Sequence, residues 1–223
     1  AGMDLSAFSN GVDDIPDDKK PDHARVGEVL YRTAKELQGY ISKLEEIRVP
    51  VIAAVHGGVI GGALDLITAC DMRFASSDAF FCIQEINIGM AADVGTLQRL
   101  PKIIPDAKMR EMAYTGRRML ADEAKDSGLV GEIYETQDEM LDAVHKLAAE
   151  IASKSPVAIY GLKAVMNYSR DHNVSDSLDF NALWSGAMLS QADMTEAMTA
   201  QMEKRDASFD KMVDVKKFNE SKS

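Results

Sequence analysis

One stretch, residues 51–100, constrains the fold of this chain more than any other. A short apolar run, Val51–Val55, ends in a cluster of four glycines, and an apolar-periodic segment, Ala63–Ala69, follows it. The run predicts a buried strand and the periodic segment predicts a helix. A glycine turn between such elements lets the backbone approach a ligand closely, and the following helix start offers unpaired amides. This order therefore predicts a binding site built around the turn.

Three acidic residues follow the glycine cluster in largely apolar or small-residue surroundings. Asp65 lies in the predicted helix. Glu85 follows two further β-like runs, Met72–Ala75 and Ala79–Ile83, and Asp93 precedes a helical pattern that begins at Val94. Carboxyl groups among apolar residues tend to have raised pKa values and suit proton transfer. For Asp93 a purely structural interpretation also stands, because Asp is a common helix N-cap.

The glycine cluster does not match the common phosphate-binding turns. No Gly-Lys-Ser/Thr follows it, and Val59 stands where a G-x-G-x-x-G motif needs glycine. A plain turn without a ligand remains an alternative. His56 adjoins the cluster and is a second choice for a base, although a packed or hydrogen-bonded structural histidine is the favoured interpretation.

Composition excludes several classes of partner. The chain has 223 residues and a net charge of −11, which argues against nucleic acid or an anionic membrane surface. No stretch reaches the roughly 18 consecutive apolar residues that a membrane helix needs. Cys70 and Cys82 are the only cysteines, so free thiols in a reducing compartment are expected, and no Cys/His spacing indicates a metal site.

The rest of the chain alternates between predicted strands and helices until about residue 152 and is helical afterwards. This predicts an α/β domain over residues 1–152 and a helical region over residues 153–223. Ser155-Pro156 is a typical helix start. Further helices are predicted at 25–47, 107–114, 121–126, 137–152, 176–189 and 193–204, and a strand at 128–134.

Two long motifs carry a family resemblance. HGGVIGGALDLITACDMRFAS and EINIGMAADVGTLQRLP resemble the crotonase (enoyl-CoA hydratase/isomerase) superfamily, and the opening Ala1-Gly2-Met3-Asp4-Leu5 is similar to its A-G-x-D motif. Asp65, Glu85 and Asp93 together most resemble the Δ3,5-Δ2,4-dienoyl-CoA isomerases. The resemblance implies an α/β spiral of ββα turns and a helical C-terminal region that builds homotrimers or homohexamers. It also implies that the N-terminal part of the family core precedes Ala1 and is missing here.

The resemblance assigns roles to individual residues. The amides of Met3 and Gly62 are expected to form the oxyanion hole for a thioester carbonyl. Glu85 is expected to remove a proton near the thioester and Asp93 to deliver one at the far end of the diene, while Asp65 positions or tunes both. The remaining expected substrate-binding residues are Ala1, Gly2, Asp4 and Leu5.

The implied activity is the conversion of 3,5-dienoyl-CoA to 2,4-dienoyl-CoA in fatty acid oxidation. Coenzyme A is then part of the acyl-CoA substrate, and no separate cofactor or metal is expected. Two alternatives remain open: a 2-enoyl-CoA hydratase, in which Glu stands at position 65 and usually Gly at position 93, and a non-catalytic CoA-binding homologue. The expected location is a peroxisome, a glycosome-like organelle or a mitochondrion, because Ser221-Lys222-Ser223 differs by one residue from the peroxisomal S-K-L signal.

Overall fold

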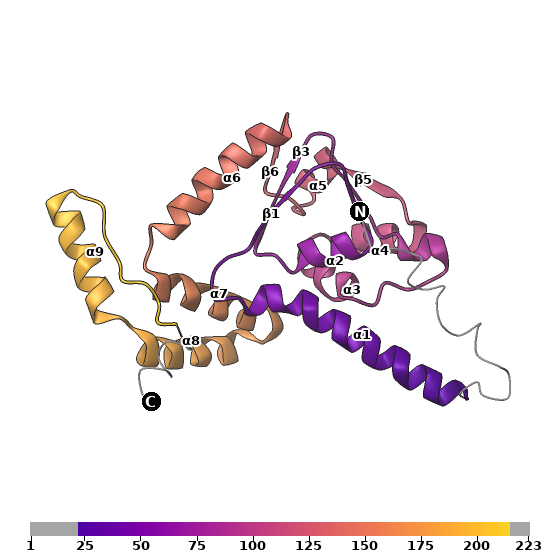
Figure 1. The fold of residues 1–223 in the computed structure, drawn as a ribbon, viewed down its shortest axis with the longest axis horizontal. Coiled ribbons are helices and arrows are strands. Elements are labelled where there is room, and N and C mark those ends of the chain that lie inside the picture. The colour runs from indigo at the N-terminus through magenta and orange to yellow at the C-terminus, as the bar shows by residue number, and fades with distance from the viewer. Residues whose placement is uncertain (1–21, 215–223) are drawn as a thin grey trace. The chain divides into compact units, whose positions relative to one another are not determined.

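The computed structural model describes residues 22–214, which form two compact units. Among these residues, the first unit comprises 22–46 and 51–141 and holds all the strands (Figure 1). The second comprises 47–50 and 142–214 and is helical. The domain boundary expected at residue 152 stays a prediction.

The first unit contains two small sheets. In one sheet, β3 (Met72–Ser76) lies between β1 (Ile52–Val55) and β6 (Glu132–Tyr134), and both pairings are parallel. In the other sheet, β4 (Phe80–Cys82) pairs with β2 (Gly58–Ile60) in parallel and with β5 (Arg118–Leu120) in the antiparallel sense. Each sheet thus collects strands that are distant in sequence.

The first four strands alternate between the two sheets, and this alternation produces the spiral. His56-Gly57 joins β1 to β2, after which α2 (Gly62–Thr68) leads back to β3, and residues 77–79 then join β3 to β4. Gly57 takes a φ of +60°, a conformation that favours glycine, at the turn between the sheets. The ββα order expected from the sequence is therefore present, as is the helical C-terminal region.

Several elements differ from the sequence predictions. The segment predicted as a glycine turn contains the short strand β2, β5 was not predicted, and Glu85 opens the 3₁₀-helix η3 (Glu85–Ile88). The helix expected from Val94 begins at Thr96 and spans four residues as α3 (Thr96–Arg99). The other helices here are α1 (His23–Glu46), η4 (Leu100–Lys102), α4 (Asp106–Thr115), α5 (Ala121–Asp126) and the start of α6 (Gln137–Ala152).

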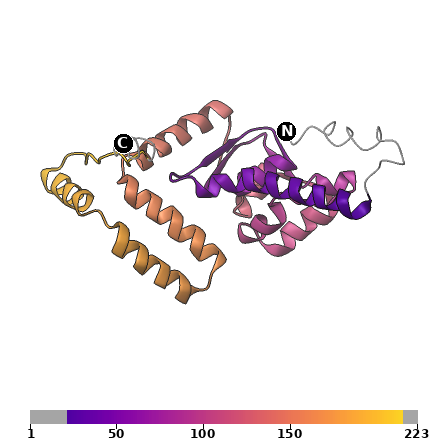
Figure 2. The ribbon, with the colours of Figure 1, turned by 60° about the horizontal axis from the view of Figure 1, so that its bottom comes forward.

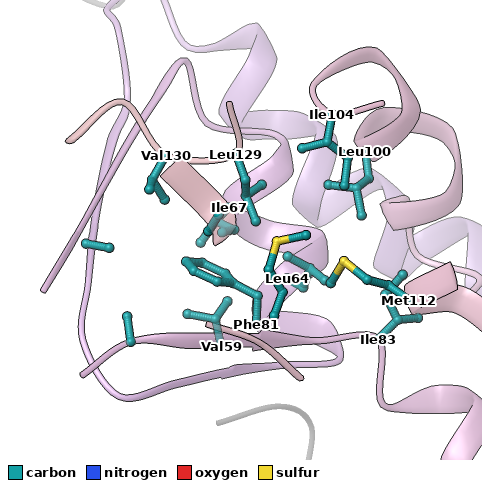
Figure 3. Close-up of a cluster of buried hydrophobic side chains, with 14 of the residues drawn as sticks. Val59, Leu64, Ile67, Phe81, Ile83, Leu100, Ile104, Met112, Leu129 and Val130 are labelled. Carbon is teal, nitrogen blue, oxygen red and sulfur yellow. The ribbon is translucent and has the colours of Figure 1, made fainter. Parts of the chain in front are cut away.

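The hydrophobic core of the first unit fixes α2 against the strands. Leu64 of α2, Phe81 of β4 and Leu129 are fully buried, and their side chains gather with Val59 and Ile67 in Figure 3. Burial of one such side chain is worth roughly 1.5–3 kcal/mol. Because Leu64 directly precedes Asp65, the packing of this core also sets the position of that acid.

Three helices make up most of the second unit. They are α7 (Pro156–Asp171), α8 (Val174–Met188) and α9 (Gln191–Glu203), and α7 lies beside α8 (Figure 2). As predicted, Ser155 caps α7, because its hydroxyl accepts a hydrogen bond from the Ala158 amide. Within residues 22–214, no helix is long and apolar enough to cross a membrane.

Close packing of α7 on α8 depends on a glycine. Gly161 is buried in α7, and a Cβ there would lie 2.5 Å from Nε1 of Trp184 in α8. The Trp184 ring also meets Tyr160 edge to face, with ring centroids 4.9 Å apart. The indole thus occupies the space that a side chain at position 161 would need.

We therefore predict opposite effects for two glycine substitutions in these helices. Gly161→Ala should lower the free energy of unfolding by about 1–3 kcal/mol, because it overpacks the contact with Trp184. Gly186→Ala, where an added Cβ meets nothing within 4 Å, should raise it by up to about 1 kcal/mol through better helix propensity. Urea unfolding followed by circular dichroism measures both, and equal effects would contradict the packing argument.

Candidate active site

The glycine turn leads directly into α2. Gly61 has a φ of +55°, its amide donates to the Cys82 carbonyl over 3.0 Å, and its carbonyl accepts from Leu64 and Asp65. Gly62 is the first residue of α2, so its amide is one of the first amides of the helix, which have no carbonyl partner within the helix. The turn therefore ties α2 to the end of β4 and places Gly62 at the helix start.

Asp65 is buried beneath this turn. Its side chain is 1% exposed, and Oδ1 accepts a 2.6 Å hydrogen bond from the Thr96 amide, while Oδ2 has no hydrogen-bond partner among the described residues. Burial raises the pKa of Asp65, the bond from Thr96 opposes this rise, and the nearby Asp93 charge adds to it. Asp65 is thus held by one oxygen only.

Glu85 approaches the turn from η3. A Cβ on Gly61 would lie 3.0 Å from Glu85 Oε1, so the missing side chain at position 61 makes room for this carboxyl group. Glu85 is half-buried, and burial is the main cause that raises its pKa. The charges of Asp65 and Asp93 raise it further. A carboxyl group with a raised pKa suits a general base near neutral pH.

Asp93 lies in the loop between η3 and α3 and is exposed. The N-cap interpretation is wrong, because the N-cap of α3 is Gly95, with a φ of +141°. The Asp93 carbonyl accepts a 2.7 Å hydrogen bond from Gln38 Nε2 of α1. Since its charge acts on both Asp65 and Glu85, the structure brings the three predicted acids into one electrostatic group.

A largely apolar cavity of about 540 Å³ adjoins the glycine turn. Its walls come from α1, the end of β1, the turn and the first part of α2, and they include Leu37, Ile41, Gly62 and Val94. His56 also lines the cavity and is exposed, so of the two structural roles expected for it, packed or hydrogen-bonded, the packed one is wrong. Such walls suit an apolar ligand chain whose polar end reaches the turn.

The N-terminal residues of the predicted site lie outside the described residues. They are the expected oxyanion-hole residue Met3 and the expected substrate-binding residues Ala1, Gly2, Asp4 and Leu5.

Sequence reasoning missed three residues near the acids: Gln38, Thr96 and Arg99. Thr96 contributes a backbone amide, which any residue supplies, so no side-chain pattern reveals it. Arg99 belongs to the quoted motif GTLQRLP, and its place in that motif was the signal that could have indicated a role near the acids.

The family model for enoyl-CoA hydratase/isomerase matches residues 6–212. The chain belongs to the enoyl-CoA hydratase/isomerase family. This confirms the family resemblance seen in the two sequence motifs.

Curated members of the enoyl-CoA hydratase/isomerase family include similar relatives. The mitochondrial Δ(3,5)-Δ(2,4)-dienoyl-CoA isomerase of Rattus norvegicus is 46% identical over 208 residues, which is 93% of this chain and 63% of the rat protein. The peroxisomal protein of that name from Arabidopsis thaliana is 44% identical over 95% of this chain and 76% of its own length. This chain therefore spans less than two thirds of the rat relative.

Solved structures of the family agree with the fold. The crystal structure of an enoyl-CoA hydratase from Bacillus anthracis has a TM-score of 0.81 and 26% identity, and the match covers 94% of this chain and 75% of that one. The expected crotonase-like architecture is therefore confirmed.

The raised pKa of Asp65 predicts how stability depends on pH. A carboxyl group whose pKa is higher in the folded chain binds more protons there, so its contribution to stability is lost as pH rises through that range. Asp65→Asn removes this ionisation and keeps an oxygen that can accept from Thr96. We therefore expect the unfolding free energy of Asp65→Asn to fall less between about pH 4, near the ordinary pKa of Asp, and about pH 8 than that of the wild type.

Urea unfolding at the two pH values tests this prediction. Asp126→Asn is the matched control, because it makes the same chemical change at a residue that is exposed at the end of α5. An identical pH dependence in wild type and Asp65→Asn would mean that Asp65 does not titrate differently on folding.

Proposed function

We propose that this chain carries the catalytic centre of a Δ3,5-Δ2,4-dienoyl-CoA isomerase. The observation that carries the proposal is the grouping of Asp65, Glu85 and Asp93 around a glycine turn beside an apolar cavity. The printed names of the rat and Arabidopsis relatives support it. The substrate is then an acyl-CoA thioester, with the diene in the cavity and the thioester at the turn.

The reaction moves one proton off the substrate and another onto it. The Glu85 carboxylate removes a proton from C2, next to the thioester, and the electrons shift the double bonds from C3 and C5 to C2 and C4. Protonated Asp93 delivers its proton to C6, so Glu85 ends protonated and Asp93 ionised. Solvent exchange then resets the pair. The raised pKa of Glu85 favours its role as the base, since a base works best with a pKa near the working pH.

The thioester oxygen gains negative charge when the C2 proton leaves. We assign its stabilisation to the amide of Gly62, at the start of α2 and on the cavity wall, together with that of Met3. Loss of one donor of this kind typically costs about 3–4 kcal/mol of barrier. Asp65 neither receives nor gives the transferred protons in this scheme; it holds the Thr96 amide and influences the charge of its neighbours.

The remaining assignments follow from the same proposal. Coenzyme A enters as part of the substrate, and the chemistry uses side-chain carboxyl groups without a separate cofactor. The helical second unit is proposed to build a homotrimer or homohexamer. The location is a mitochondrion or a peroxisome, the two compartments named for the rat and Arabidopsis relatives.

An ultraviolet scan with 3,5-dienoyl-CoA tests the activity. Conjugation of the diene with the thioester creates a longer chromophore, so the isomerase predicts new absorbance at long wavelength. A parallel scan with 2-enoyl-CoA detects hydration as loss of the enoyl chromophore. Hydration without isomerisation would favour a hydratase, and ligand binding without either change would favour a non-catalytic homologue.

Substitution of the two proton-transfer acids gives a sharper prediction. Glu85→Gln and Asp93→Asn should each lower kcat for isomerisation by about 10²- to 10⁴-fold, because each removes a general acid–base group. Both proteins should still fold, as checked by circular dichroism, and should still bind 3,5-dienoyl-CoA, as checked by calorimetry. Asp126→Asn serves as the control with normal turnover, and near-normal turnover in Asp93→Asn would refute its role.

A further inference from the structure

Polar residues on one face of α1 fasten the segment that carries Asp93. Gln38 Nε2 donates to the Asp93 carbonyl over 2.7 Å. Further along the helix, Arg99 Nη2 donates to Ser42 Oγ over 2.9 Å and to Glu45 Oε2 over 2.7 Å. Positions 38, 42 and 45 follow the spacing of four and three residues that places side chains on one helix face. The segment 93–99 is thus attached to α1 at both of its ends.

The same segment is attached to α2 between these two points. The Thr96 amide donates to Asp65 Oδ1 in the core of the site. The residues that follow Asp93 are therefore held from two helices, by a buried carboxylate of α2 and by the polar face of α1 that Gln38, Ser42 and Glu45 form.

The attachment at Arg99 is well shielded from water. The side chains of Arg99 and Glu45 are 13% and 15% exposed, so their ion pair is screened less than a surface pair. The backbone beside the ion pair requires glycine at position 95. Gly95 has a φ of +141°, and a Cβ there would overlap the Arg99 guanidinium. The Arg99 end of the segment is therefore held firmly. The position of the other end, at Asp93, depends on a separate supporting contact.

That support is a single contact. Among the described residues, the bond from Gln38 is the one hydrogen bond from a side chain to the backbone of residues 91–94. Asp93 is exposed, so a water molecule can replace the Gln38 amide without leaving a buried group unsatisfied. Loss of this bond should then affect the placement of Asp93 more than the stability of the fold.

We propose that Gln38 is a positioning residue for Asp93. By holding the Asp93 carbonyl it keeps the carboxyl group of that residue at the distance from Glu85 that proton delivery at the far end of the diene requires. Gln38 itself touches the Asp93 backbone and does not transfer a proton. The proposal rests on the proposed function, in which Asp93 delivers a proton. A misplacement of about 1 Å can lower a rate about 10²-fold, so one anchor of this kind has a measurable effect.

The test compares two identical substitutions at different places. Gln38→Met keeps the approximate shape and apolar length of the side chain but removes the donor. Gln98→Met is the matched control, because Gln98 is exposed in the same segment. Gln38→Met should lower kcat for isomerisation about 10- to 100-fold, with KM within about twofold of wild type, and Gln98→Met should change neither.

A double variant separates positioning from a general structural effect. If Gln38 acts through the Asp93 carboxyl group, Gln38→Met should cause no further loss of kcat in an Asp93→Asn background. A similar loss of kcat in both backgrounds, or an unchanged kcat in Gln38→Met alone, would overturn the proposal.

A second measurement does not depend on activity. Hydrogen–deuterium exchange of peptides that cover residues 89–97 should be faster in Gln38→Met than in wild type, and unchanged in Gln98→Met. If wild-type protein shows no isomerisation, the proposed function fails, and exchange then decides the anchoring alone. Faster exchange supports it, and unchanged exchange overturns it.

Discussion

The hydrogen bond from the Thr96 amide to Asp65 Oδ1 holds the parts of the site together. It joins α2, which begins at the glycine turn, to the segment that follows Asp93. A buried carboxyl group with neither oxygen bonded would be costly, because a desolvated polar group without a partner loses its interactions with water. The bond reduces that cost for Asp65 and links two elements that the sheets do not connect.

Charge is the second organising factor. The chain has a net charge of −11 and still places three acids where each can affect another. Arg99 partly offsets them, since its charge lowers the pKa of Asp65 while its guanidinium also pairs with Glu45. Burial and the neighbouring charges still leave the pKa values of Asp65 and Glu85 raised, which suits a site that must take up and release protons.

The sequence predicted the parts of the site that depend on side-chain type. The apolar run before the glycines, the helix that contains Asp65 and the three acids are all visible as residue patterns. The strand β2 was missed because it begins at Gly58, inside the glycine cluster that predicts a turn, and β5 was missed because Arg118–Leu120 belongs to no longer apolar run. Thr96 and Gln38 were missed for another reason: one contributes a backbone amide and the other contacts a backbone carbonyl 55 residues away, and neither contact leaves a mark in local sequence.

The loop that carries Asp93 lies outside both sheets, between η3 and α3. The side chain at position 93 is exposed, so strand register and core packing do not depend on it, whereas position 65 is enclosed by the core. Evolution can exchange a side chain in this loop at little cost to folding and still place it beside the buried acid. A scaffold of this kind can gain or lose a second proton-transfer group, and with it a new reaction, through a single codon change.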